Sequence, residues 1–162
     1  MNYIFEILQD GFFAAIAAIG FASISNPPRQ AYGFCALIAA VGHATRYILM
    51  HNAYYEVHII GSSLVAAFAI GVLAVFLVPY AKCPAETFSF PALLPMIPGM
   101  YAYRTIEALI MCLSNKEEQM FTHYFYLFSY NGLSCVFIVV ALVIGATVPI
   151  FLFNKISFNA TR

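Results

Sequence analysis

The stretch VHIIGSSLVAAFAIGVLAVFLVPY, residues 57–80, decides the fold class, because it contains no Asp, Glu, Lys or Arg. An α-helix of this length is about 36 Å long, enough to cross a hydrocarbon core of about 30 Å with some tilt. An apolar run of this length is typical of a membrane span and is longer than the core of a soluble domain requires. We therefore predict a transmembrane helix here.

The composition of the whole chain supports the same fold class. Of the 162 residues, 63% are hydrophobic and 9% are charged, whereas about a quarter of the residues in an ordinary soluble domain are charged. So short a chain cannot bury that apolar surface within itself, so the rest must face lipid or partner subunits. The net charge is zero, so no field attracts nucleic acid. We predict an all-α integral membrane protein, with residues 1–162 as a single membrane domain.

Four further spans are predicted on either side of residues 57–80, at about 4–25, 31–50, 90–113 and 131–153. The first ends at Asn26-Pro27-Pro28-Arg29, since paired prolines interrupt helices. Aromatic residues crowd positions 121–130, which is typical of an interfacial belt before the last span. With five spans, the basic residues gather mainly on the side of the carboxyl terminus, which would then be cytoplasmic.

The fourth segment begins FPALLPMIPG, residues 90–99, with three prolines and a glycine. A continuous helix through it would lose several backbone hydrogen bonds. We predict a proline-broken, irregular or re-entrant stretch near 90–104, in which a helix starts near Pro98 or Gly99 and ends near Leu113. The number of transmembrane helices is therefore four to five, and the orientation above fails if this segment does not cross.

Small residues recur at four-residue steps on three predicted spans: Ala14 and Ala18, Ala36 and Ala40, and Ala67 and Gly71. Such steps let helix backbones approach closely in lipid, where dispersion contacts drive association. They predict a tight bundle.

Several ionisable residues lie inside predicted spans, where a charge costs at least a few kcal/mol. His43 and Arg46 share one helix face, as do Arg104 and Glu107, because each pair is three residues apart. We interpret Asp10, His43, Arg46 and Glu107 as candidate coupling residues, with Asp10 and Glu107 as candidate proton carriers. The alternatives are an interfacial Asp10, a packing role for His43, a snorkelling Arg46, and an intrahelical ion pair between Arg104 and Glu107.

The broken segment also predicts an anion site. A half-helix that starts at membrane depth presents free backbone amides and the positive end of its dipole. With nearby hydroxyls and a guanidinium, this end of the helix could hold a carboxylate, through a candidate substrate-binding set of Pro95, Pro98, Gly99, Tyr101, Tyr103 and Arg104. The alternative is a proline-kinked helix that only packs against its neighbours.

Other chemistry is not indicated. The cysteines are scattered without a CxxC pair, at Cys35, Cys83, Cys112 and Cys135, which argues against a zinc site or a disulfide framework. Glu6 and Asp10 have no histidine at metal-ligand spacing, so we predict neither a metal nor a cofactor. We also predict that the chain is not an enzyme, because no nucleophile and acid–base set stands at recognisable spacing.

Two blocks of sequence resemble the threonine/serine exporter (ThrE) family, and within it the small YjjB-like membrane subunit. The first runs from Gly20-Phe21-Ala22 through the paired prolines to Gly42-His43-Ala44-Thr45-Arg46, and the second is residues 90–104. The resemblance covers about residues 11–140. His43 departs from it, since an aromatic residue is more usual there, and residues 121–130 have no counterpart.

The resemblance implies a small subunit of a two-component secondary transporter in the bacterial cytoplasmic (inner) membrane. It implies export of threonine or serine, or of a dicarboxylate such as succinate, together with a larger membrane subunit of the same family. A hetero- or homo-oligomer in the lipid bilayer, without nucleic acid, is therefore expected. The alternative is a scaffold or assembly subunit that stabilises a larger transporter without taking part in transport, in which case the partner alone would retain full transport.

Overall fold

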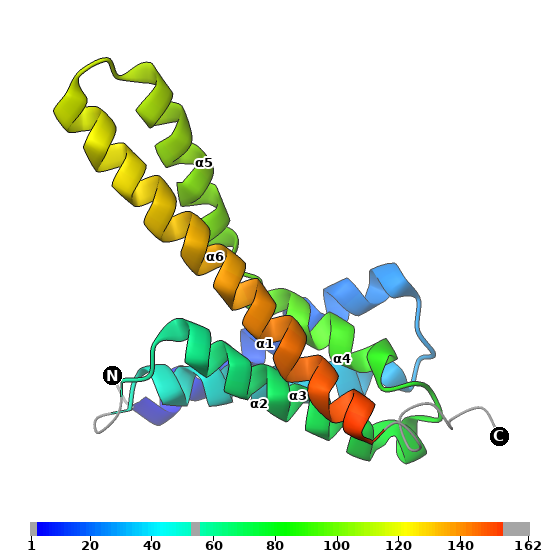
Figure 1. Cartoon of the computed structure of the whole chain (residues 1–162). Coiled ribbons are helices and arrows are strands. Elements are labelled where there is room, and N and C mark those ends of the chain that lie inside the picture. Colours follow the sequence, from blue (N-terminus) through cyan, green and yellow to red (C-terminus); the bar gives the residue numbers. More distant parts are fainter. Residues whose placement is uncertain (1–2, 53–55, 154–162) are drawn as a thin grey trace. The chain divides into compact units, whose positions relative to one another are not determined.

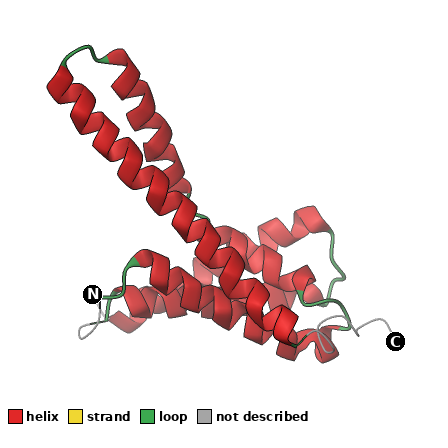
Figure 2. Ribbon diagram, in the orientation of Figure 1, coloured by secondary structure: helices red, strands yellow, loops and turns green. Residues whose placement is uncertain are grey.

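The computed structural model describes residues 3–52 and 56–153, and their regular secondary structure is entirely helical (Figures 1 and 2). This confirms the all-α class. The elements, in chain order, are α1 (Tyr3–Ser25), α2 (Ala31–Met50), α3 (Ile59–Ala81), α4 (Glu86–Leu93), the 3₁₀ helix η1 (Leu94–Met96), α5 (Gly99–Ser114) and α6 (Glu118–Leu152).

Four of these helices, α1, α2, α3 and α6, are long and apolar enough to cross a membrane. The first three match the predicted spans to within two residues at each end. The fourth, α6, has 35 residues and joins the aromatic stretch at 121–130 to the predicted span at 131–153 in one continuous helix. The α5 helix has 16 residues, or about 24 Å, which is short for a span.

The proline-broken segment is present, but it begins later than the sequence predicts. Residues 90–93 are helical, because α4 continues through a buried Pro91; so short a helix loses little from one missing donor. The break follows, where η1 contains Pro95 and the chain then turns through Ile97 and Pro98. As predicted, the next helix starts at Gly99.

The chain folds as two compact units. Unit 1 contains the described residues up to Met96 and those from Ala141 to the end of α6, and unit 2 is Ile97–Val140. The α6 helix therefore contributes its first part to unit 2 and its last part to unit 1. A single membrane domain over residues 1–162 stays a prediction.

Unit 1 is built on close contacts between helix backbones. On α1 the buried positions follow a small-residue stripe, Gly11, Ala14, Ala18 and Ala22. A Cβ atom on Gly11 would lie 3.3 Å from the Ala40 carbonyl oxygen of α2, and one on Gly71 of α3 would lie 2.5 Å from the Ala146 carbonyl oxygen of α6. The small-residue steps in the sequence therefore do mark sites of close helix packing.

Unit 2 is a helical hairpin in which α5 and the first part of α6 run side by side (Figure 1). The two helices touch near the turn, where the Cys112 thiol points at the Phe121 carbonyl oxygen at 3.8 Å. Further along, a Cβ atom on Gly132 would lie 3.3 Å from the Thr105 methyl group. Large apolar side chains such as Ile110 and Phe125 stay exposed on both helices, as expected for a hairpin that faces lipid or another subunit.

Candidate functional site

A polar cluster joins α1 to α2 in unit 1. Its centre is a contact of 3.1 Å between His43 Nδ1 and Asp10 Oδ2, two atoms from residues 33 positions apart. His43 is 6% exposed, and Asp10 is half-buried. Asp10 therefore has an intramolecular partner, and the structure brings together two residues that the sequence could only mark separately.

Arg46, one turn along α2, points toward the break in the chain. Its Nη1 donates a hydrogen bond of 3.1 Å to the carbonyl oxygen of Met96, the last residue of η1. The guanidinium is therefore held by a backbone acceptor inside unit 1, in contrast to the snorkelling alternative. Candidate residues Asp10, His43 and Arg46 thus form one site, at which η1 ends.

Two members of this cluster were not predicted from the sequence. The Tyr47 hydroxyl donates a hydrogen bond of 2.7 Å to Glu6 Oε2, and the Tyr47 ring stacks on that of His51 with 4.1 Å between centroids. The usable signal was a matched spacing: Glu6 and Asp10 are four apart on one helix, and His43 and Tyr47 are four apart on the other. We call Glu6, Asp10, His43, Arg46 and Tyr47 the polar cluster.

One ring nitrogen in the polar cluster has no partner. His43 Nε2 is buried and makes no hydrogen bond among the residues that the structure describes. An unsatisfied buried polar atom of this kind costs about 1–3 kcal/mol. Such atoms are rare in native proteins, so this nitrogen is a candidate for a role in function.

A second polar site lies in unit 2, between α5 and α6. A hollow of about 460 Å³ is lined by polar and apolar side chains of both helices: Arg104, Glu107, Ala108, Met111, Tyr124, Leu127, Tyr130 and Asn131. We call it the α5–α6 pocket. It brings a cation, an anion, two phenols and an amide to one place.

The two charged residues of the α5–α6 pocket are exposed and form no ion pair with each other. Among the described residues, the one ion pair is that of His43 with Asp10. The intrahelical ion pair considered for Arg104 and Glu107 is therefore absent from this structure. Both groups are left available to a ligand or a partner.

The predicted substrate-binding residues are divided by the structure. Pro95 lies in η1 of unit 1, whereas the other five follow at the start of α5 in unit 2. Arg104 lines the α5–α6 pocket, but Tyr101 and Tyr103 do not. The Gly99 amide is already bonded to the Ile97 carbonyl oxygen at 2.8 Å, so this amide is not free to hold an anion. The pocket residues Tyr124, Tyr130 and Asn131 were missed, because their stretch reads as an interfacial belt.

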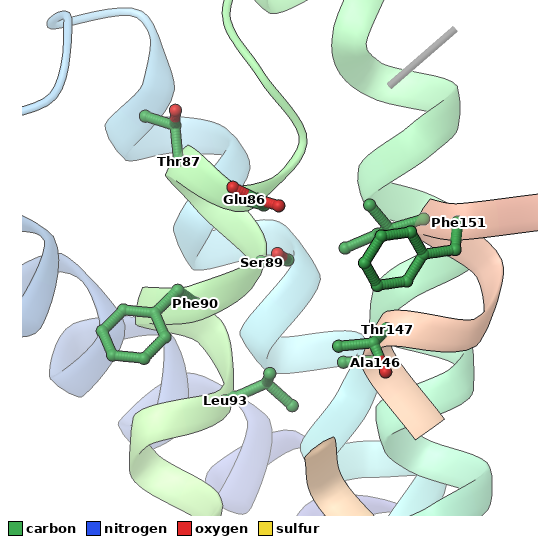
Figure 3. Close-up of a pocket in the computed structure, with 9 residues that line it drawn as sticks. Glu86, Thr87, Ser89, Phe90, Leu93, Ala146, Thr147 and Phe151 are labelled. Carbon is green, nitrogen blue, oxygen red and sulfur yellow. The ribbon is translucent and has the colours of Figure 1, made fainter. Parts of the chain in front are cut away.

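A further hollow, of about 500 Å³, lies in unit 1 between α4 and the end of α6. In Figure 3, Phe90 and Leu93 of α4 and Phe151 of α6 account for much of its wall, and Glu86 and Thr87 stand at one end. Its lining is mainly apolar, and Glu86 is its one charged residue. The α5–α6 pocket therefore offers a polar solute more charged and hydrogen-bonding groups than this hollow does. No group of three metal-ligating side chains occurs in the part of the chain that the structure describes.

These features define the class of the protein. The chain has four long apolar helices and groups its ionisable residues at two sites, which are features of a multi-pass α-helical membrane protein. The threonine/serine exporter (ThrE) family matches residues 10–152, and the chain belongs to this family of exporter-type membrane transporters.

A relative in Haemophilus influenzae, an uncharacterized protein, is 36% identical over 108 residues. The match covers 67% of this chain and 35% of the relative, so the chain spans about a third of the length of that protein. No solved structure matches.

Proposed function

We propose that this chain is the small subunit of a two-component secondary transporter that exports small carboxylates from the bacterial cytoplasm. Membership of the exporter family supports the transport function. The observation that carries the proposal for a site is the α5–α6 pocket, in which Arg104 and Glu107 stand one turn apart without pairing. Charged side chains that line a cavity of a membrane protein are candidates for a substrate pathway.

The chemistry of the pocket favours a zwitterion over a dianion. The Arg104 guanidinium matches a carboxylate in a bidentate manner, and the Glu107 carboxylate attracts an ammonium group. The Tyr124 and Tyr130 phenols and the Asn131 side chain can bond a hydroxyl group. Threonine and serine carry all three groups, whereas the second carboxylate of succinate would meet Glu107. The substrate in this proposal is therefore a hydroxy amino acid.

The partner in this proposal is a larger membrane subunit of the same family. In the relative from Haemophilus influenzae the matched part is 35% of the length, so further sequence stands beside it in that protein. The exposed apolar side chains of both hairpin helices, such as Ile106 and Val136, offer a surface for such a subunit or for lipid.

Counterflow in reconstituted vesicles tests the proposal. The chain is purified with the membrane partner that accompanies it, and vesicles are loaded with unlabelled threonine, serine or succinate. We expect labelled threonine or serine to accumulate against its own unlabelled pool. If an intact complex shows no counterflow of any of the three, the transport proposal is wrong.

Arg104→Ala tests the site. The side chain is exposed, so the variant should insert and assemble normally, yet we expect it to lose counterflow. Arg29→Ala removes an exposed arginine from the turn after α1 and is the matched control. Normal counterflow by Arg104→Ala would refute the site. Full counterflow by the partner alone would instead show that this chain is a scaffold.

A further inference from the structure

The Asp10–His43 pair has the features of a proton-exchange site. Nδ1 of the imidazole lies 3.1 Å from the Asp10 carboxylate, which as an ionised group can only accept a hydrogen bond. Nδ1 therefore carries the hydrogen, and in the neutral ring Nε2 carries the lone pair. That nitrogen is buried and has no partner among the described residues, so a proton can add to it without breaking a hydrogen bond.

The charges around His43 favour such a proton. Helix α1 contributes Glu6 and Asp10, and α2 contributes Arg46 and, near its end, His51. The other packed helices add little: α3 contains no charged residue and has His58 as its N-cap, and α4 carries Glu86 in its first turn. With His43 neutral, the polar cluster contains two carboxylates against one guanidinium. One added proton brings the net charge of the cluster to zero, and a net charge is costly inside a membrane protein.

The same cluster is connected to the segment that leads into unit 2. Arg46 holds the Met96 carbonyl oxygen at 3.1 Å, and the next residue along the chain, Ile97, is the first residue of unit 2. A positive imidazolium one turn from Arg46 competes with it for the Asp10 carboxylate. Protonation of His43 therefore changes the electrostatic balance that holds Arg46 on the end of η1.

We propose that the Asp10–His43 pair takes up and releases the proton that drives transport, and that Arg46 transmits its charge state to η1. The proposal rests on the transport function proposed above. Uptake forms one N–H bond at Nε2 with a proton delivered by water, and release returns that proton to water. Because Nε2 is sealed from solvent in this conformation, each exchange needs the packing around α2 to open, which ties proton movement to conformational change.

The test separates exchange from net transport in vesicles that contain the purified complex. Counterflow moves no net proton, whereas accumulation driven by a pH gradient does. One coupled proton per substrate can support about tenfold accumulation per pH unit. In His43→Asn, the Asn amide can still donate to Asp10 from about the position of Nδ1, but it cannot take up a proton. We expect this variant to keep counterflow and to lose accumulation driven by the gradient.

His123→Asn, at an exposed position on α6, is the matched control and should behave as the wild type. Gradient-driven accumulation that persists in His43→Asn would overturn the proposal, as would a wild type that exchanges substrate but ignores the gradient. Absence of counterflow in the wild type would instead reject the transport function. In that case a titration of His43 still tests whether this residue takes up a proton.

For that titration, the reconstituted chain is labelled with ¹⁵N-histidine, and the His43 signals are assigned by their loss in His43→Asn. The titration runs from about pH 5 to 8. We expect the signals to report both the neutral and the protonated ring, and we expect Asp10→Asn to change the proportion of the two states. An imidazole that stays in one protonation state across this range would overturn the proposal, whatever the transport result.

Discussion

Replacing Gly71 by alanine should separate α3 from the end of α6. A Cβ atom at this position would lie 2.5 Å from the Ala146 carbonyl oxygen, 3.2 Å from its carbonyl carbon and 3.1 Å from Pro149 Cγ. Ordinary van der Waals contact starts at 3.4 Å, so the shortest of these distances is 0.9 Å too small. Because the obstacle is the backbone of another helix, no change of rotamer can relieve it.

The expected size of the effect follows from two opposing contributions. Overpacking a close contact costs about 1–3 kcal/mol, while alanine is favoured over glycine inside a helix by about 0.5–1 kcal/mol. The difference is a net loss of about 1 kcal/mol for Gly71→Ala, with an upper limit of about 2.5 kcal/mol. Gly20→Ala is the matched control, because a Cβ atom there meets nothing within 4 Å, and it should be neutral or slightly stabilising.

Unfolding of the purified chain in mixed micelles, titrated with a denaturing detergent and followed by circular dichroism, measures this difference. We expect the midpoint of Gly71→Ala to fall below that of the wild type, and that of Gly20→Ala to stay at or above it. Gly145→Ala should repeat the loss from the other side of the contact, since its Cβ atom would lie 2.5 Å from the Leu64 carbonyl oxygen. If Gly71→Ala and Gly20→Ala unfold at the same midpoint, the inference that α3 packs closely against α6 is wrong.

Three further outcomes are expected. Glu107→Gln should weaken counterflow of threonine relative to succinate by about fivefold, because a solvated charge contact contributes up to about 1 kcal/mol; an unchanged ratio would argue against a zwitterion in the α5–α6 pocket. Tyr47→Phe removes the hydrogen bond to Glu6 and should lower the midpoint of the detergent titration, whereas an unaltered titration would show that this bond contributes nothing. Burial raises the pKa of the Cys83 thiol, so at neutral pH the reactive thiolate is scarce. Labelling of Cys83 by a maleimide should therefore be about tenfold or more slower in the native chain than after denaturation, and its rate should rise with pH. Equally fast labelling in both states would contradict the burial of this thiol.

The sequence was sufficient for the class and for most helix boundaries. An uncharged run such as residues 57–80 leaves no soluble alternative, and the boundary at Asn26 and Pro27 is local, since Asn26 adopts a positive φ of 46° before the prolines. The error at α4 has an equally local cause. Three prolines read as a continuous break, but Pro91 lies in a helix too short to lose much from one missing bond, and the break is confined to η1 and the turn after it.

The sites were less predictable, because their partners are distant in the sequence. Asp10, His43 and Arg46 stand out individually by the cost of a charge in the membrane. Their meeting depends on how α1 and α2 are aligned, which is fixed by contacts such as that of Gly11 with Ala40 and has no signature in either helix alone. In unit 2 the aromatic composition at 121–130 hid Tyr124, whose position in the pocket emerges once α6 is known to be one helix folded back on α5.

The two polar sites differ in how their charges are balanced, and this difference bears on the proposed division of roles. In the polar cluster, Arg46 and Asp10 already have protein partners, so a substrate carboxylate there would have to displace the Met96 carbonyl oxygen. A proton needs no such displacement, because it adds to a free lone pair. In the α5–α6 pocket, Arg104 and Glu107 have no ion-pair partner among the described residues and can be neutralised together by a molecule that carries both charges. If one site served both roles, substrate and proton would compete for the same groups, and separate sites avoid that competition.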